Sequence, residues 1–470
     1  MNVVIIGGGI IGCAVARFLS EYQLNITVLE RGADVSVGAT KANSGILHSG
    51  YDCKPGTVKA DMNVKGLAMY PRLAQELDIP YRMNGSMVIS MDATTDKLQA
   101  LYENGIANGV TGMEILTGQE AKKIEPNLNH LVTSALRAKN AGIISPYEAA
   151  IAFAENAAEN GAKFILDTTV TGIKPSNDGF IVHTTSGDFS ASVVINAAGV
   201  ESGNIYNMVD VHSKKESILP QRGQYYLLDN TQRELVSHTI FQLPTRLGKG
   251  VLIAPTVDYN VLIGPTAEDI DDLSDTSTTV EGLAETLEKA KYSLESVPVK
   301  DRITNFAGIR AKHESQDFII NESIPGFINA LGIDSPGLTS APAIASRIAE
   351  MALARLEPKK NASFNPRRLG IKRFRELNKQ EQSDLIRQNP AYGRIVCRCE
   401  TITEAEILEA IRRPIGARNL DAIKRRTRAQ MGRCQGGFCS VRLIELLSQE
   451  LNIDETAVTK NGAGSEVVLR

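Results

Sequence analysis

The chain has 470 residues, and its 51 Lys and Arg nearly balance its 54 Asp and Glu, which leaves a formal net charge of −3. Hydrophobic residues make up 43% and charged residues 22%, as in a globular protein with a real core, which excludes a disordered chain, a collagen-like chain and a disulfide scaffold. The charge balance also argues against a globally basic nucleic-acid binder, so we expect no nucleic-acid partner. At roughly 150 residues per domain, the length predicts about three domains.

The start of the chain indicates a cytoplasmic protein. An apolar strand pattern, Val3 to Ile6, begins almost at once, without a basic leader or a cleavage site, and no run of about 20 apolar residues predicts a membrane span. Cytoplasmic thiols stay reduced. This favours metal or redox roles over disulfides for four cysteines grouped near the end of the chain, whereas Cys13 and Cys53 are expected to pack as small hydrophobic residues. The grouped cysteines are Cys397, Cys399, Cys434 and Cys439.

The first thirty residues predict a dinucleotide-binding unit. A β-branched strand, 2–6, precedes Gly7, Gly9 and Gly12, which fit the pattern G-x-G-x-x-G, and a helical stretch and a second strand follow. The glycines allow a tight turn, close approach of the backbone to a pyrophosphate and packing of the helix on the strand, and the helix N-terminus faces the phosphates. Glu30 ends the second strand, where a carboxylate can bind ribose hydroxyls.

Three later segments favour FAD over NAD as the dinucleotide. The small and hydroxyl-bearing residues of 38–50 suit a chain running along an isoalloxazine ring, and 193–199 reads as a buried strand ending in small residues. The third segment, 327–339, reads as a strand and loop before a helix over 340–355, which gives a second helix N-terminus for the cofactor. Because a nicotinamide domain is normally contiguous and no second glycine unit is present, we expect FAD.

The motifs at 43–50, 307–311 and 332–337 make residues 1–355 resemble the D-amino-acid-oxidase-like superfamily of FAD-dependent oxidoreductases. Within this superfamily, the sequence is most similar to the glycerol-3-phosphate and L-2-hydroxyglutarate dehydrogenases. The resemblance implies an α/β fold, in which a Rossmann-like FAD-binding domain (about 1–80, 144–200 and 300–355) is interleaved with an α+β substrate domain (about 81–143 and 201–299). Strand patterns at 218–228, 237–242, 250–254 and 260–264 predict that an antiparallel sheet in the second domain roofs the flavin.

The resemblance also implies specific site residues. Arg310 would grip the anion of the substrate over the flavin, since a guanidinium binds a carboxylate or phosphate with two parallel bonds. His48, which lies in the 38–50 segment expected to run along the flavin (the flavin segment), and His313 are candidates for anion contact or for accepting the hydroxyl proton. The expected FAD contacts are Gly7, Gly9, Ile11, Gly12, Glu30, Arg31, Thr40, Asn43, Ser44, Gly45, Val170, Ala198, Gly199, Gly332, Ile333, Gly337, Leu338 and Thr339.

The other cations and histidines receive plainer interpretations. Lys312 and Arg222 are weaker candidates for anion binding. The remaining histidines, namely His130, His183, His212 and His238, are interpreted as ordinary polar residues.

The C-terminal part predicts a linker and a small cysteine-ligated domain. Residues 356–392 are polar and basic, and such a run usually forms a solvated face. The cysteines then form C-x-C and C-x4-C pairs, with the capping-box sequence of 403–406 starting a helix between them and a last helix over 440–451. Four thiolates can hold Zn²⁺ or a [2Fe–2S] cluster, but structural zinc sites usually use C-x2–4-C spacing in both pairs. Glycines at 432, 436 and 437 let backbone N–H groups point at sulfur.

The C-terminal module, with its two cysteine pairs, closely resembles the bacterioferritin-associated-ferredoxin-like [2Fe–2S] domain. This resemblance implies that the four cysteines hold a [2Fe–2S] cluster, in a small helical domain over 393–455 with a tail over 456–470. The basic run at 424–428, together with Arg398 and Arg433, is expected to offset the negative charge of the cluster.

Together, the two resemblances imply an FAD-dependent dehydrogenase that oxidises a small anionic hydroxy compound and passes electrons through a [2Fe–2S] cluster to a partner protein or subunit. Glycerol 3-phosphate, oxidised to dihydroxyacetone phosphate, is the favoured substrate; L-2-hydroxyglutarate is the first alternative and an amino acid the next. A flavin and iron–sulfur electron-relay protein without its own substrate is the non-enzymatic alternative. Peripheral membrane association through a partner stays open.

Overall fold

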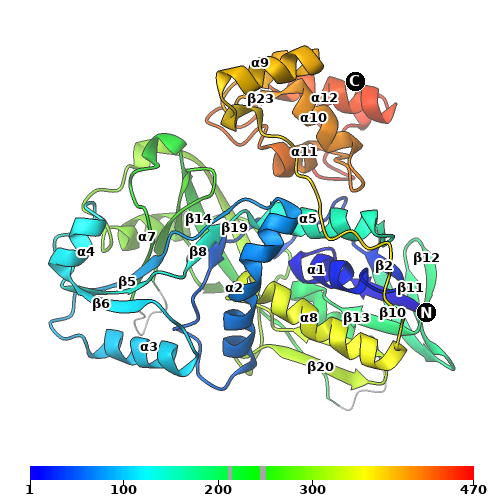
Figure 1. Ribbon diagram of the computed structural model, residues 1–470, viewed down its shortest axis with the longest axis horizontal. Coiled ribbons are helices and arrows are strands. Elements are labelled where there is room, and N and C mark those ends of the chain that lie inside the picture. Colours follow the sequence, from blue (N-terminus) through cyan, green and yellow to red (C-terminus); the bar gives the residue numbers. More distant parts are fainter. Residues whose placement is uncertain (210–213, 244–249, 470) are drawn as a thin grey trace.

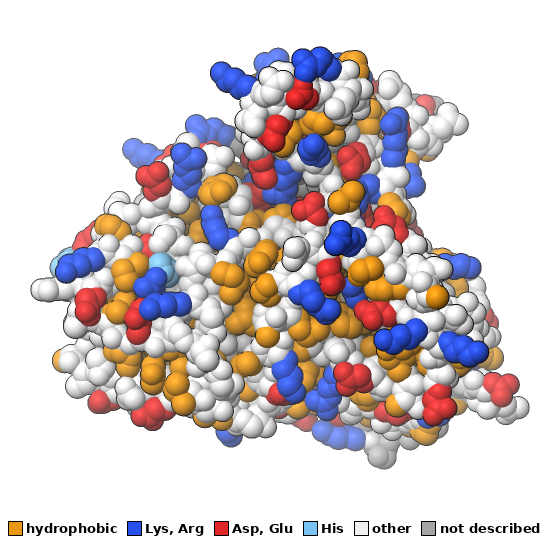
Figure 2. All heavy atoms as spheres, viewed as in Figure 1, with side chains coloured by type: hydrophobic (Ala, Val, Ile, Leu, Met, Phe, Trp, Pro, Cys, Tyr) orange, Lys and Arg blue, Asp and Glu red, His pale blue; other side chains and the backbone are white. Residues whose placement is uncertain are grey.

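The computed structural model describes residues 1–209, 214–243 and 250–469. The chain forms a large N-terminal unit (residues 1–356) and a smaller C-terminal module (residues 374–469), which an extended segment connects (Figure 1). No helix among the described residues is both long and apolar enough to cross a membrane. Charged side chains of both signs gather where the module meets the N-terminal unit (Figure 2).

A six-stranded sheet forms the centre of the N-terminal unit. Its strands are parallel except for the edge strand β20, and the order β21-β13-β1-β2-β9 requires crossover connections on the faces of the sheet. In the order of the sheet, the strands are β20 (Ile319–Ile324), β21 (Phe327–Leu331), β13 (Val193–Asn196), β1 (Asn2–Ile6), β2 (Asn25–Leu29) and β9 (Lys163–Ile165).

Both faces of this sheet are covered, so its strands are apolar on both sides. Val3 and Ile5 of β1 pack against helices, whereas Val4 and Ile6 face a three-stranded sheet, as the two-residue repeat of a strand requires. The helices are α1 (Ile10–Leu19), α2 (Val58–Leu77), α5 (Pro146–Glu159) and α8 (Gly337–Leu356); α6 (Ser202–Asn207) follows β13. The covering strands are β10 (Val170–Ser176), β11 (Gly179–Thr184) and β12 (Gly187–Ala191).

A nine-stranded, mostly antiparallel sheet forms the second domain, as the sequence predicted. Its strands are β18 (Glu268–Asp269), β14 (Leu219–Leu228), β17 (Val261–Gly264), β16 (Leu252–Pro255), β15 (Thr239–Gln242), β5 (Ser86–Ser90), β7 (Ser134–Ala138), β6 (Met113–Thr117) and β19 (Arg302–Lys312). Helices α3 (Asp96–Ala107), α4 (Gly118–Ile124) and α7 (Val280–Ala290) belong to this domain, and a small sheet contains β3 (Ile46–Leu47), β8 (Gly142–Ile144) and β4 (Tyr81–Arg82). β19 pairs with β14 along its whole length, which places Arg310 opposite Gln221.

The C-terminal module has its own apolar core, which includes Cys397, Ile407, Ile423 and Leu447. Its elements are α9 (Lys379–Gln388), β22 (Ile395–Cys397), β23 (Ile402–Thr403), α10 (Glu404–Arg412), α11 (Leu420–Thr427) and α12 (Ser440–Leu451). The capping box at Thr403 and Glu406 is present as predicted. Part of the expected tail packs against the module, because Val458 is fully buried in this core.

The prediction that the basic residues of 356–392 form a solvated face is wrong for Arg368, Arg373 and Arg375. Their side chains are only 9%, 23% and 20% exposed, and each forms an ion pair with a buried carboxylate, namely Glu155 for Arg368 and Asp258 for Arg373 and Arg375. Helix α9 lies with the module in Figure 1. The basic run therefore belongs to an interface between the two parts of the chain rather than to a free linker.

Candidate active site and cysteine cluster

The glycine turn after β1 is shaped for close backbone approach. Gly7 has a φ of 111°, and a Cβ there would lie 2.5 Å from the carbonyl oxygen of Ala197. A Cβ at Gly12 would lie 1.9 Å from the carbonyl oxygen of Gly7, so only glycine lets α1 pack against this turn. The first turn of α1 has neither a side-chain cap nor an acidic residue. Its N-terminus thus suits a bound pyrophosphate.

The acid that ends β2 lies beside this turn. The carboxylate of Glu30 is buried and accepts hydrogen bonds from the backbone N–H groups of Gly8 (2.6 Å) and Gly32 (2.7 Å). Burial raises the pKa of Glu30, although these N–H groups oppose the shift. Thr40 accepts a hydrogen bond from the N–H of Ile10 at 3.0 Å, which brings the flavin segment to the start of α1.

Three segments that are far apart in the sequence meet beyond this turn: β19, residues 38–50 and the start of α8. A Cβ at Gly308 of β19 would lie 2.0 Å from the carbonyl oxygen of Ala42, so the roof strand touches the 38–50 segment. Thr339 Oγ1 accepts from the N–H of His48 at 2.9 Å and donates to the carbonyl oxygen of Ile46 at 3.1 Å. The N-terminus of α8 has no side-chain cap and no acid in its first turn, so it too is open to an anion.

The other predicted FAD contacts lie in different parts of the N-terminal unit. Val170 is buried at the start of β10, and Ala198 and Gly199 follow β13 next to the glycine turn. The amide of Asn43 bonds backbone groups of its own segment, including the N–H of Gly45 at 2.8 Å. Arg31 is exposed and pairs with Glu201, so its guanidinium lies at the rim of this region.

Arg310 is half-buried on β19 and has only neutral partners. Its guanidinium donates to Gln221 Oε1 at 2.9 Å and to the carbonyl oxygen of Thr266 at 3.2 Å. Across the residues that the structure describes, Arg310 forms no ion pair, which argues against a surface salt bridge as its role. Two neutral acceptors orient the fork and leave its charge available for an anion.

His48 lies where the flavin segment meets the loop before α8. Its ring stands 5.7 Å from that of Phe241, and its Nε2 is 3.5 Å from Ser335 Oγ. Neither Phe241 nor Ser335 was identified from the sequence, because no local pattern relates them to His48. These two contacts place an apolar ring and a hydroxyl beside His48.

His313 occupies a different environment from His48. Its ring nitrogens bond Glu216 Oε2 at 2.8 Å and Ser315 Oγ at 2.9 Å, and a Cβ at Gly332 would lie 2.6 Å from the Cβ of His313. His313 lies directly after β19, whereas Arg310 lies within this strand. His313 therefore supports the Gly332 loop in this structure.

The weaker candidates of the sequence are engaged elsewhere. Arg222 is buried and pairs with Glu268 at 2.9 Å and Asp275 at 2.6 Å, and Lys312 lies 3.6 Å from Asp269. His130, His183 and His238 each pair with a carboxylate, whereas His212 lies outside the described residues. Cys13 and Cys53 are buried, as expected for small hydrophobic residues.

The four C-terminal cysteines come together as two close pairs, Cys397 with Cys439 and Cys399 with Cys434. A hydrogen bond with Cys439 lowers the pKa of Cys397 to about 6, against burial, and backbone N–H groups of Gln430 and Glu400 contribute. Although burial acts against it, backbone N–H groups at 436–438 lower the pKa of Cys434. The partners shift the other way: the hydrogen bond with Cys397 raises the pKa of Cys439, and, although the backbone N–H of Cys434 opposes it, burial raises the pKa of Cys399. The loops thus aim N–H groups at the sulfurs of Cys397 and Cys434, as the glycines predicted.

The spacing of the sulfurs suits two metal ions better than one. Among the described residues, three metal-binding side chains approach within 4.8 Å of one another only at Glu216, His313 and Glu314, so no three cysteine sulfurs meet that limit. A single tetrahedral Zn²⁺ would bring all four sulfurs to about 3.8 Å from one another. Two separate pairs instead match a [2Fe–2S] cluster, in which each iron takes two thiolates.

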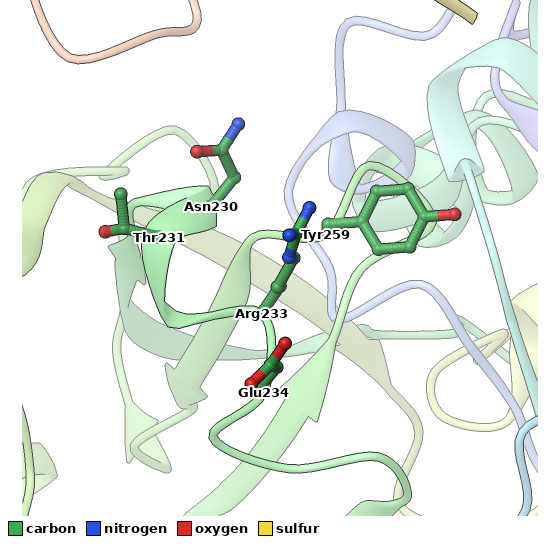
Figure 3. A pocket seen from close by; sticks show the side chains of 5 residues that line it. All are labelled: Asn230, Thr231, Arg233, Glu234 and Tyr259. Atoms are coloured by element: carbon green, nitrogen blue, oxygen red, sulfur yellow. The ribbon is translucent and has the colours of Figure 1, made fainter.

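A surface depression of about 430 Å³ lies on the domain of the nine-stranded sheet, here called the roof domain, and none of the residues that line it belongs to the flavin segment. It is lined by Asn230, Thr231, Arg233, Glu234 and Tyr259 (Figure 3). It contains none of the predicted site residues, but its neighbour Asp229 pairs with Arg433, which precedes Cys434. The depression therefore borders the contact between the two parts of the chain.

The fold and these two sites define a flavoprotein oxidoreductase with an attached cysteine-ligated cluster domain. The comparisons agree: residues 2–351 match the family of FAD dependent oxidoreductases, and residues 395–449 match the BFD-like [2Fe-2S] binding domain. The chain belongs to this FAD dependent oxidoreductase family. Its expected cofactors, FAD and a [2Fe–2S] cluster, are thereby confirmed.

Three similar proteins illustrate how closely this chain is related to known enzymes. A glycerol 3-phosphate dehydrogenase of Caloramator mitchellensis is 47% identical and covers 99% of this chain and 98% of its own length. The human mitochondrial L-2-hydroxyglutarate dehydrogenase is 32% identical over 57% of this chain and 60% of its own length. The structure of L-alpha-glycerophosphate oxidase from Mycoplasma pneumoniae with FAD bound superposes with a TM-score of 0.74 at 29% identity, covering 78% of this chain and 98% of its own.

The turn at Gly12 provides a test of the cofactor site. Replacing Gly12 with Ala is expected to destabilise the protein by roughly 3 kcal/mol or more and to abolish tight FAD binding, because the added Cβ collides with backbone. Gly172→Ala is the matched control, since the nearest side-chain atom to a Cβ there is 3.6 Å away and Gly172 is not an expected FAD contact. Urea unfolding and the ratio of FAD to protein measure both effects. FAD content equal to that of the wild type in Gly12→Ala would contradict the assignment.

Proposed function

We propose that this chain oxidises glycerol 3-phosphate to dihydroxyacetone phosphate and passes the electrons through its [2Fe–2S] domain to an acceptor protein. The observation that carries the substrate class is Arg310, a half-buried guanidinium with two neutral partners, on a strand that touches the flavin segment. Such a group favours a substrate with a dianionic or anionic end. The similarity to the dehydrogenase of Caloramator mitchellensis over nearly the whole chain favours the phosphate ester.

The proposed roles of the residues follow from their positions. Arg310 binds the phosphate of the substrate with two N–H donors and so orients the alcohol carbon. His48 accepts the hydroxyl proton at Nε2 as the C–O bond becomes a carbonyl. FAD, when bound, supplies the hydride acceptor, and its expected contacts in the glycine turn, the 38–50 segment and the start of α8 hold and orient it. His313 is proposed to position the Gly332 loop.

The presence of the C-terminal module supports transfer of the electrons to a protein acceptor rather than directly to oxygen. The Mycoplasma pneumoniae oxidase matches 98% of its own length yet only 78% of this chain, whereas the dehydrogenase relative covers the module as well. Cys399 is exposed at the surface, and Phe438 and Val441, which flank Cys439 in the sequence, are 82% and 68% exposed. These features support a protein partner that docks beside the cluster ligands and takes electrons.

Anaerobic titration separates the candidate functions. Glycerol 3-phosphate is expected to bleach the flavin absorbance of the purified protein within seconds, with L-2-hydroxyglutarate much less effective. Preferential bleaching by L-2-hydroxyglutarate would assign the chain to the alternative substrate, which its similarity to the human L-2-hydroxyglutarate dehydrogenase favours. Failure of every hydroxy acid and phosphate ester in a panel would contradict the enzymatic proposal and favour an electron relay.

A further inference from the structure

Three buried carboxylates of the N-terminal unit hold arginines of the C-terminal part. Their side chains are at most 3% exposed, and each accepts bonds from two guanidinium groups that lie far away in the sequence. The sets are Asp34 with Arg425 and Arg426, Glu155 with Arg368 and Arg413, and Asp258 with Arg375 and Arg428. The run at 424–428, which was expected to offset the charge of the cluster, is thus mostly paired with the N-terminal unit.

The third set closes into a ring with Glu400, and we call these four residues the clamp ring: Asp258, Arg375, Glu400 and Arg428. Arg375 bonds Asp258 at 2.5 Å and Glu400 at 2.7 Å, and Arg428 bonds the same carboxylates at 2.9 Å and 2.8 Å. Two cations and two anions of the ring therefore compensate each other. Arg373 approaches Asp258 from outside the ring at 3.6 Å and has Glu148 as its closer partner at 2.6 Å.

The clamp ring joins three parts of the chain beside the cluster site. Asp258 lies in the turn between β16 and β17 of the roof domain, and Arg375 lies just before α9. Glu400 follows the ligand Cys399, and Arg428, with a φ of 70°, ends α11. The remaining amino group of Arg428 donates to Asn260 at 2.8 Å, so every nitrogen of this guanidinium is bonded across or within the interface.

Beside the clamp ring, ion pairs rather than closely packed side chains join the two parts of the chain. A cavity of about 310 Å³ lies beside it, lined by parts of the connecting segment, α5 and α11, so side chains do not fill this part of the interface. Close by, Tyr147 of α5 bonds the sulfur of Met431 at 3.7 Å, three residues before Cys434. The start of α5 adjoins the flavin segment, because the N–H of Ile144 donates to the carbonyl oxygen of Gly45.

We propose that the clamp ring fixes the [2Fe–2S] module in one position on the flavin unit, with Asp258 as its main positioning residue. Removing the carboxylate of Asp258 would leave Glu400 as the one ring carboxylate bonded to both Arg375 and Arg428. The interface would then carry an excess positive charge, and the module would separate to hydrate it. The proposal rests on the proposed electron route but not on the identity of the substrate. The single electron that the oxidised cluster accepts would come from reduced flavin, and the fixed position sets the distance.

The test uses the full chain loaded with both cofactors. Asp258→Asn is expected to increase the radius of gyration measured by X-ray scattering. It is also expected to slow cluster reduction on the order of tenfold or more after photochemical reduction of the flavin, which requires no substrate. Arg375→Gln, at a less buried position of the ring, is a second variant with the same expected direction if Asp258→Asn does not fold.

Two controls lie close to the ring but outside it. Asp229→Asn breaks the pair with Arg433, whose side chain is 66% exposed, and Tyr259→Asn changes the residue next to Asp258 in the same turn. Both are expected to behave like the wild type. Unchanged scattering and transfer rate in both ring variants would overturn the proposal. So would loss of the iron–sulfur spectrum in Asp258→Asn with unchanged scattering, because the ring would then serve only the fold of the cluster site.

Discussion

Replacing Arg310 with Ala is expected to lower kcat/KM for glycerol 3-phosphate about a thousandfold while leaving the FAD content unchanged. The lost contact is a charge-assisted bond to the substrate phosphate in a half-buried site, where truncation costs on the order of 4 kcal/mol. Because the partners of Arg310 among the described residues are Gln221 and a backbone carbonyl, its removal leaves none of their carboxylates uncompensated. The effect should therefore fall on the substrate rather than on the fold. Anaerobic flavin reduction at varied substrate concentration measures it.

Two further variants test whether the loss of kcat/KM comes from the guanidinium group of Arg310. Arg310→Lys keeps the charge but loses the planar fork, so an intermediate loss is expected. Arg302→Ala removes an exposed arginine from the start of the same strand and should leave kcat/KM unchanged. A kcat/KM for Arg310→Ala within threefold of the wild type would contradict the role of Arg310 as the anion clamp.

Replacing Cys397 with Ser is expected to remove the iron–sulfur absorption and about two iron atoms per chain, because the cluster needs four thiolates. Cys397 is buried and pairs with Cys439, so a hydroxyl there can neither replace the thiolate nor reach solvent. Reduction of the flavin by substrate should stay within about twofold of the wild type, since the active site lies in the N-terminal unit. Electron transfer to an external protein acceptor should be lost.

Metal analysis and visible spectra of the two proteins decide this prediction. Cys53→Ser is the matched control, because Cys53 is also buried but lies outside the module. Zinc in place of iron in the wild-type protein, or an unchanged iron content in Cys397→Ser, would contradict the assignment of the four cysteines to a [2Fe–2S] cluster.

Much of the active site could be predicted because its signals are local. The glycine turn, the acid ending β2 and the small residues of 38–50 each depend on backbone geometry within a few residues, which the residue types reveal directly. The resemblance to a known superfamily then added the distant partners, including Arg310 and the start of α8. The surroundings of His48 and the two neutral partners of Arg310 were not predictable, since strand pairing brings them together from distant positions.

The sequence by itself was enough to predict FAD binding and cluster binding, because a dinucleotide turn and two cysteine pairs are defined by spacing along the sequence. Only the tertiary structure decided what the arginines of 368–428 do. A basic run has no register of its own, and a solvated face, a counter-charge for a cluster and a buried interface all look alike in sequence. The partners Asp34, Glu155 and Asp258 come from three separate parts of the N-terminal unit. Burial then turns the same charges from weak surface groups into contacts that place one domain on another.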